Sequence, residues 1–185
     1  RDDLIKFGEK YNLKVGTIAD LIDYKLSKES TIENVHTKEV STEFGEFRLD
    51  VWRDVIFDEH HFSLTKGSPE KADVPMVRVQ TQSVLQDTLG IDEIGKKWSI
   101  RKSLQKISDE GTGVFVLINH RDAKTYWLSS LKDENIEPKR NRRVIGIGSQ
   151  ILRSLGLSRI NVLGTPTKYS GLSGFNIEIE GFIDE

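Results

Sequence analysis

The sequence predicts an α/β fold, a layered α/β/α domain around a mixed sheet that two short helices precede. Three observations favour this class. Residues 44–52 and 61–64 alternate between apolar and polar side chains, as half-buried strands do. Residues 114–118 are continuously apolar, which is typical of a central strand buried on both faces. Amphipathic segments at 98–107 and 142–155 alternate with the later strands, which favours helices packed on a sheet.

The N-terminal residues 1–26 predict two short helices. Leu4, Phe7 and Tyr11 give the first an apolar stripe at helical spacing. Thr17, with Asp20 three residues later, resembles a capping box that opens the second. Helices this short are marginal alone, so we expect both to dock on another part of the protein.

A polar stretch, residues 27–39, is interpreted as a linker because it lacks a long apolar run. A second unit is expected to begin near Val40 and to span 40–185. Its first strands are expected to be antiparallel, and 74–79 is expected to be the third of them.

Glycines and apolar runs delimit the second half of that unit. The first helix is expected to end near Gly111, and Gly156 is placed to end the second. Residues 160–163 and 175–182 read as the last two strands.

Composition excludes several classes of protein. Of the 185 residues, 36% are hydrophobic and 30% charged, a globular balance with material for a core. The net charge of −2 provides no general attraction for nucleic acid, and no run approaches the roughly 18 apolar residues of a membrane span. Cysteine is absent, which excludes disulfides, thiolate metal sites and cysteine nucleophiles. The chain begins with Arg1 and its one Met is Met76, so we expect a fragment of a longer protein, with a cytoplasmic location as the default.

The histidines do not form a recognisable metal motif. His60 and His61 are neighbours on an expected strand and should point to opposite faces, while His36 and His120 lie far from them in sequence. We therefore expect no metal bound through histidine, and hydrogen-bonded or exposed imidazoles instead.

Two further motifs could bind phosphate. Gly146 and Gly148 suggest a phosphate loop, but no lysine follows and small residues for close helix packing are the favoured interpretation. The basic run 139–143 could bind a phosphate or a nucleotide, although the acidic residues Asp133 and Glu137 nearby favour a solvated, partly paired surface.

Several segments, in order, resemble the riboflavin-pathway family that joins 3,4-dihydroxy-2-butanone 4-phosphate synthase to GTP cyclohydrolase II. Residues 1–26 resemble the last helices of the synthase, through the ending TIADLIDYK. The remainder is similar to the cyclohydrolase domain in these segments: VSTEFGEF, HHFSLTKG, MVRVQTQS, DEGTGVFVL and GSQILRSLGLSRINVL. The resemblance implies a GTP cyclohydrolase II-like fold.

The family's zinc-binding positions differ here. Members hold zinc, which activates water, through three cysteines. The corresponding positions in this chain are Ser83, Ile94 and Lys96, and the neighbouring His and Glu of the motif are Gln80 and Gln82. Hydroxyl, hydrocarbon and ammonium groups do not replace thiolates, so we expect no metal.

Other parts of the family's active site are altered as well. The glycine-rich substrate loop is replaced by 119–128, and the segment with the catalytic tyrosine is shortened. Four residues could remain as ligand contacts at the family's positions: Arg78, Asp87, Arg143 and Lys168.

The resemblance therefore implies a catalytically inactive GTP cyclohydrolase II-like domain, with a structural, dimerisation or regulatory role and no catalytic residue of its own. It implies a homodimer and a synthase domain upstream in the same polypeptide, which would use Mg²⁺, whereas this chain would need no cofactor. The alternatives are a nucleotide- or phosphate-binding module, a divergent GTP cyclohydrolase II hydrolase, and an enzyme with a new metal-free activity.

Overall fold

The computed structural model describes residues 2–16, 24, 30–91, 98–119, 142–166 and 175–184. Within them, seven strands form one mixed sheet in the order β1-β2-β3-β5-β4-β6-β7. The strands are β1 (Ile32–Thr42), β2 (Gly45–Asp54), β3 (Glu59–Lys66), β4 (Met76–Thr81), β5 (Gly113–Ile118), β6 (Arg159–Leu163) and β7 (Glu178–Ile183).

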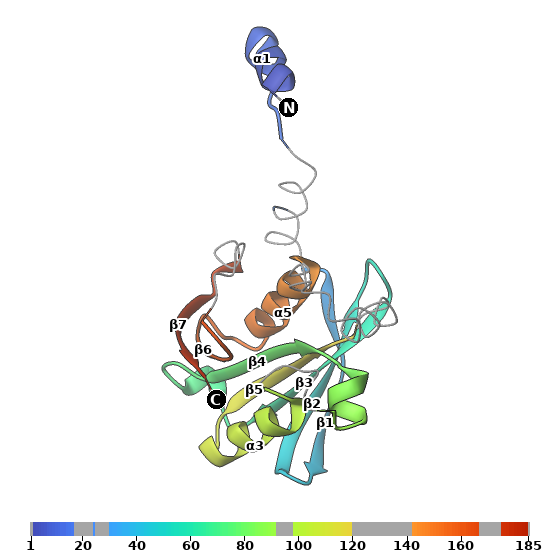
Figure 1. Ribbon diagram of the computed structural model, residues 1–185, viewed down its shortest axis with the longest axis vertical. Coiled ribbons are helices and arrows are strands. Elements are labelled where there is room, and N and C mark those ends of the chain that lie inside the picture. Colours follow the sequence, from blue (N-terminus) through green and yellow to red (C-terminus); the bar gives the residue numbers. More distant parts are fainter. Residues whose placement is uncertain are drawn as a thin grey trace.

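Helices cover both faces of this sheet (Figure 1). α5 (Arg142–Ser154) packs on one face and α3 (Ile100–Glu110) on the other. A hydrophobic core lies on each face of the sheet, and successive side chains of β5 point into both. Val114 and Val116 belong to the core under α5, and Phe115 belongs to the core under α3. The predicted α/β/α layering and mixed sheet are confirmed.

The direction of the strands changes across the sheet. β1, β2 and β3 are antiparallel, β3 pairs antiparallel with β5, and β5, β4, β6 and β7 are parallel. The parallel neighbours β4 and β6 share two residue pairs, Met76↔Asn161 and Val77↔Val162, whereas β4 and β5 share five. β5 is the fourth of the seven strands in the sheet order and is therefore central, as its apolar run predicts.

The linker prediction is wrong for residues 32–39, which form most of β1, and the folded unit begins before Val40. β1 is an edge strand, and seven consecutive residues after Ile32 are exposed, so the apolar alternation that marks a strand is missing. Its backbone instead pairs with β2 from Ile32↔Asp54 to Thr42↔Gly45. This segment is a strand because its backbone pairs with β2, and a hydropathy pattern carries no information about such pairing.

Helix ends follow the sequence closely. Gly111 closes α3 with φ of 77°, and Gly156 follows α5 with φ of 82°. Both angles lie in the left-handed region that a side chain disfavours, so the predicted glycine stops are confirmed. β4 is displaced by two residues from the predicted 74–79, and it pairs in parallel with β5 and β6, so its expected place among the antiparallel strands is wrong. β7 begins three residues and ends one residue later than the predicted 175–182.

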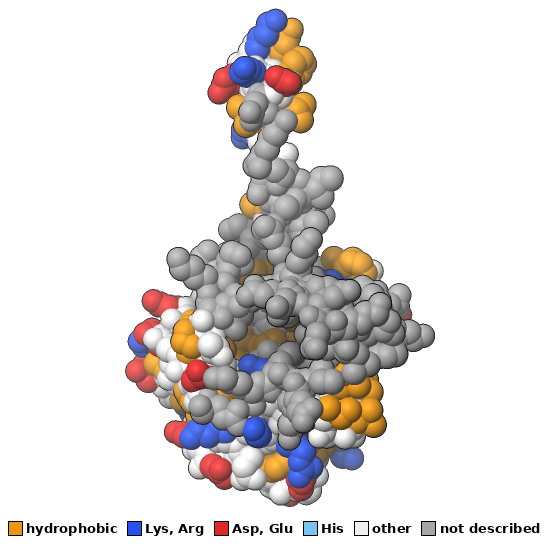
Figure 2. All heavy atoms as spheres, in the orientation of Figure 1, with side chains coloured by type: hydrophobic (Ala, Val, Ile, Leu, Met, Phe, Trp, Pro, Cys, Tyr) orange, Lys and Arg blue, Asp and Glu red, His pale blue; other side chains and the backbone are white. Residues whose placement is uncertain are grey.

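The first N-terminal helix is present as α1 (Asp2–Tyr11). Its apolar stripe is uncovered, with Leu4 64%, Phe7 54% and Tyr11 54% exposed, and Figure 2 shows hydrophobic side chains of this helix at the surface. The expected docking of this helix therefore has no counterpart among the described residues. The second expected helix, 17–26, lies almost wholly outside them.

Two short turns complete the described elements: η1 (Pro69–Lys71) and η2 (Val84–Thr88), the latter directly after β4. No helix in the described part of the chain is long and apolar enough to cross a membrane.

Candidate functional site

The carboxyl ends of β4, β5 and β6 form the natural ligand edge of this sheet. α3 connects β4 to β5 on one face, and α5 leads from β5 back across β4 to β6 on the other. Successive connections therefore diverge between β4 and β6, and ligands of α/β sheets bind beyond the strand ends at such a point. Arg78 lies on β4 itself, and Ser83 and Asp87 lie in the segment that follows it.

Ser83 and Asp87 serve the backbone of η2 and α3. The Ser83 hydroxyl accepts a hydrogen bond from the Gln86 backbone N–H at 3.4 Å, so it caps the turn. The Asp87 carboxylate accepts from the Ser83 N–H at 2.7 Å and from the Ile100 N–H at 3.2 Å. Ile100 is the first residue of α3, where a negative charge also meets the positive end of the helix dipole. Asp87 therefore anchors α3 to the end of β4.

Arg78 connects β4 to β6 and to the segment before α3. Its Nη1 donates to the Leu163 carbonyl at 2.6 Å, and its Nη2 donates to the Trp98 carbonyl at 3.2 Å. Its Nε donates to Gln80 Oε1 at 2.9 Å. The guanidinium lies where β4 and β6 diverge and supplies bonds across their short ladder.

Arg143, in the first turn of α5, contacts two buried carboxylates. Its Nη2 lies 2.5 Å from Glu59 Oε2 and 3.1 Å from Asp54 Oδ2, while its guanidinium stacks 3.7 Å from the centroid of the Phe57 ring. Asp54 is 2% and Glu59 6% exposed. Since buried carboxylates need a compensating cation, Arg143 joins α5 to the β2–β3 hairpin.

His61 belongs to the same buried region. It is 0% exposed, and its Nδ1 accepts the backbone N–H of Asn119 at 3.2 Å. Burial lowers the pKa of His61 below its ordinary value of 6.5, and Arg143 adds to this, whereas Asp54 and Glu59 oppose it. Exposed His60 lies on the other face of β3, as alternation predicts. His61 is therefore a neutral hydrogen-bonded imidazole, in agreement with the sequence-based expectation.

Sequence reasoning missed Asp54 and Glu59 as partners of Arg143. They lie 89 and 84 residues from it in sequence, and neither belongs to a recognisable motif. One available signal was position, because both acids flank the same hairpin turn and occupy inward places on their strands.

The donors do not fit a zinc ion. Of the three family positions, the structure describes Ser83, whose hydroxyl already caps a turn. No group of three His, Cys, Asp or Glu side chains placed to hold a metal occurs among the described residues. Neutral hydroxyls are also poor ligands for zinc beside thiolate, imidazole and carboxylate. Ile94, Lys96 and Lys168 lie outside the described residues, as do 139–141 of the basic run.

Gly148 packs inside α5 rather than opening a phosphate loop. A Cβ atom built on it would lie 2.7 Å from Val79 Cγ1 of β4. Close helix–sheet packing, the favoured interpretation of the sequence, is what the structure contains.

Comparisons with known proteins agree with this architecture. The family model for GTP cyclohydrolase II matches residues 33–184. The chain is 34% identical over 97% of its length to 3,4-dihydroxy-2-butanone 4-phosphate synthase of Pseudomonas syringae pv. tomato, covering 51% of that protein. It is 31% identical over 96% of its length to riboflavin biosynthesis protein RibBA of Aquifex aeolicus, covering 48% of that protein.

A solved structure has the same fold. It is RibBX from A. baumannii, described as a two-domain 3,4-dihydroxy-2-butanone 4-phosphate synthase, with 31% identity and a TM-score of 0.69 over 100% of this chain and 50% of the other. The chain thus spans about half the length of these relatives. On the match over residues 33–184, the chain belongs to the GTP cyclohydrolase II family.

Proposed function

We propose that this chain is a catalytically inactive GTP cyclohydrolase II-like domain with a structural, dimerisation or regulatory role. It would act within a riboflavin-pathway protein whose other half carries 3,4-dihydroxy-2-butanone 4-phosphate synthase activity. The proposal rests on the side chains at the family's functional positions, because their polar atoms are engaged in holding the fold.

The engagement is specific at each described position. Ser83 caps a turn, Asp87 accepts two backbone N–H groups, and Arg78 donates to two backbone carbonyls. A ligand at this edge would have to break these bonds, each worth about 1–3 kcal/mol where a charged group takes part. Evolution toward stability rather than turnover would give this arrangement.

Arg143 argues against simple phosphate capture at the same edge. A phosphate would compete with Asp54 and Glu59, which already approach its guanidinium at 3.1 and 2.5 Å. Displacing them would leave two buried carboxylates uncompensated, at a cost of several kcal/mol. A nucleotide- or phosphate-binding module at this edge is therefore the less favoured alternative.

The relatives support the assignment to the pathway. Those compared above are named as the synthase or as RibBA, and this chain spans about half of each. We propose accordingly that the synthase active site and its Mg²⁺ belong to an upstream domain, that the protein works as a homodimer in the cytoplasm, and that this chain needs no cofactor.

Zinc analysis and a GTP turnover assay on the purified 185-residue chain test the proposal. We expect substoichiometric zinc and no release of formate from GTP. Stoichiometric zinc together with formate release would contradict it and establish a divergent hydrolase.

A cysteine variant controls for the choice of positions. The triple substitution Ser83→Cys, Ile94→Cys and Lys96→Cys restores three thiolates, and we expect it to bind zinc without GTP turnover, because the substrate loop remains altered. Failure of the triple variant to bind zinc would contradict the assignment of residues 83, 94 and 96 to the family's zinc-binding positions.

A further inference from the structure

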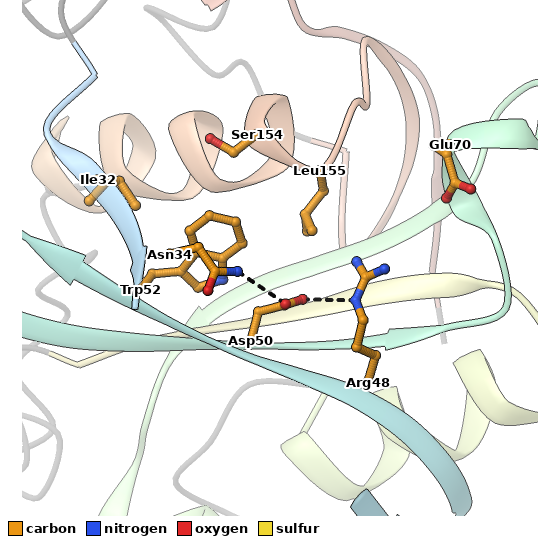
Figure 3. Close-up of a pocket in the computed structure, with 8 residues that line it drawn as sticks. All are labelled: Ile32, Asn34, Arg48, Asp50, Trp52, Glu70, Ser154 and Leu155. Atoms are coloured by element: carbon orange, nitrogen blue, oxygen red, sulfur yellow. Dashed lines mark hydrogen bonds and ion pairs between the residues drawn. The ribbon is translucent and has the colours of Figure 1, made fainter. Parts of the chain in front are cut away.

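A polar groove lies between β1, β2, η1 and the end of α5. Its volume is about 500 Å³, within the range of small-molecule sites. Figure 3 shows residues of β1, β2 and η1, with the last turn of α5, converging on it. Arg48 pairs with Thr65, which pairs with Val114 at the start of β5, so the Arg48 end of the groove lies toward the amino ends of the parallel strands. Its other end reaches Ile32, which pairs with Asp54.

A buried carboxylate forms the base of the groove. Asp50 is 3% exposed, and it accepts hydrogen bonds from Thr37 Oγ1 at 2.6 Å and Asn34 Nδ2 at 3.1 Å. Arg48 Nε donates to its other oxygen at 3.1 Å. Donors from two strands thus satisfy Asp50, which leaves it as an anchor rather than as a ligand for solutes.

Asp50 orients the guanidinium of Arg48. The bond uses Nε, and Figure 3 shows the two terminal nitrogens, Nη1 and Nη2, farther from Asp50 than Nε is. Among the described residues they make no hydrogen bond or ion pair. The edge formed by Nη1 and Nη2 matches the two oxygens of a carboxylate or phosphate. An anchored guanidinium also loses less side-chain entropy when it binds such a group.

Apolar and polar groups complete the walls. Trp52 and Ile32 are buried, with 4% and 5% exposure, and close the floor of the groove, while half-buried Leu155 provides apolar surface beside them. Ser154 and Glu70 also line the groove, and no ion pair joins Glu70 to Arg48 within 4.0 Å. The guanidinium of Arg48 and the carboxylate of Glu70 are therefore separate, and apolar side chains also line the groove.

We propose that this groove binds a small molecule of mononucleotide size that carries an oxyanion, phosphate or carboxylate, on a flat or apolar body. The oxyanion binds Nη1 and Nη2 of Arg48, the body lies against Trp52 and Leu155, and Glu70 accepts hydrogen bonds from amino or hydroxyl groups. This site is independent of the proposed loss of cyclohydrolase activity.

Chemical-shift titration of the ¹⁵N-labelled 185-residue chain tests the site. The probes are GMP for a phosphate, orotate for a carboxylate on a flat ring, and guanosine as the ring without an anion. We expect GMP or orotate to shift the Trp52 indole N–H and the Asn34 side-chain amide, with guanosine at least about tenfold weaker, since a charged hydrogen bond is lost. Which of the two binds identifies the oxyanion.

Two variants separate binding from folding. Arg48→Gln should lower the affinity for the probe that binds by at least about tenfold. Arg53→Gln is the matched control, because Arg53 lies on the same strand, is similarly exposed and bonds Asp58 through Nε at 2.7 Å, yet lies outside the groove. It should bind the probe like the unchanged chain.

Ser154→Trp provides a second, charge-neutral test, since it fills the groove from an exposed position on α5. It should abolish the shifts while the thermal midpoint is retained. Absence of shifts at Trp52 and Asn34 with both anions would overturn the proposal. So would equal binding of guanosine and GMP, or unchanged binding in Arg48→Gln.

Discussion

Asp87 and Ser83 each use a side-chain oxygen to accept backbone N–H groups near the end of β4. The sequence identifies both positions through the family resemblance, but not that the Asp87 carboxylate accepts the N–H groups of Ser83 and Ile100. Residue types at a site are readable from sequence, whereas hydrogen-bond partners depend on how the chain folds back. Arg143 gives the same lesson, because its acidic partners lie more than 80 residues away.

His61 predicts a pH dependence of stability. Its pKa in the folded protein is lowered, chiefly by burial, below the ordinary value of 6.5. As pH falls through 6.5 the unfolded chain takes up a proton that the folded protein does not, so the free energy of unfolding decreases. The decrease continues until the pH reaches the lowered pKa, with a limiting slope of about 1.4 kcal/mol per pH unit.

Urea unfolding at several pH values between about 6.5 and 5 measures this slope. His61→Gln should reduce it, and His60→Gln should reduce it much less, because the exposed neighbour on β3 is the smallest cause of the lowered pKa of His61. An equal slope in His61→Gln and the unchanged chain would show that other groups cause the acid sensitivity.

Among the elements, those with buried faces could be predicted, whereas the exposed edge strand β1 could not. α5, β5 and β6 were predicted to within a few residues, because a buried face leaves an apolar pattern. β1 leaves none, since it is exposed along most of its length and owes its conformation to β2. Register and pairing between elements are likewise absent from a hydropathy pattern.

The contact between α5 and β4 predicts an overpacking effect. Gly148→Ala should destabilise the protein by about 1–2 kcal/mol, although alanine favours helices, because its Cβ would meet Val79 Cγ1 at 2.7 Å. Chemical unfolding of the single variants and of Gly148→Ala with Val79→Ala forms a double-mutant cycle. We expect the second substitution to relieve the first by about 1 kcal/mol, whereas additive costs would mean that the two residues do not interact.

At the scale of the whole molecule, Arg143 connects α5 to the antiparallel half of the sheet. Arg143→Met should reduce stability by about 3–5 kcal/mol, because it leaves buried Asp54 and Glu59 without this cation. Arg101→Met is the comparison: Arg101 bonds Glu43 at 2.5 Å, but their side chains are 67% and 53% exposed. Screening by water should limit that loss to less than about 1 kcal/mol.

Thermal and urea unfolding of both variants measure the difference. Similar losses in the two would show that the Asp54–Glu59–Arg143 cluster contributes no more than a surface pair. A large loss confined to Arg143→Met would support a folding role for Arg143.

The short ladder between β4 and β6 bears on where this molecule can change without falling apart. Two residue pairs join these strands, against ten between β1 and β2 and seven between β2 and β3 among the described pairings. The edge at the carboxyl ends of β4 and β6 therefore spans the shortest strand pairing in the described sheet, where separation breaks the fewest backbone hydrogen bonds. The Arg48 groove lies instead on β1 and β2, whose ten residue pairs form the longest strand pairing among the described residues, so a ligand bound there would contact the part of the sheet held by the most backbone hydrogen bonds.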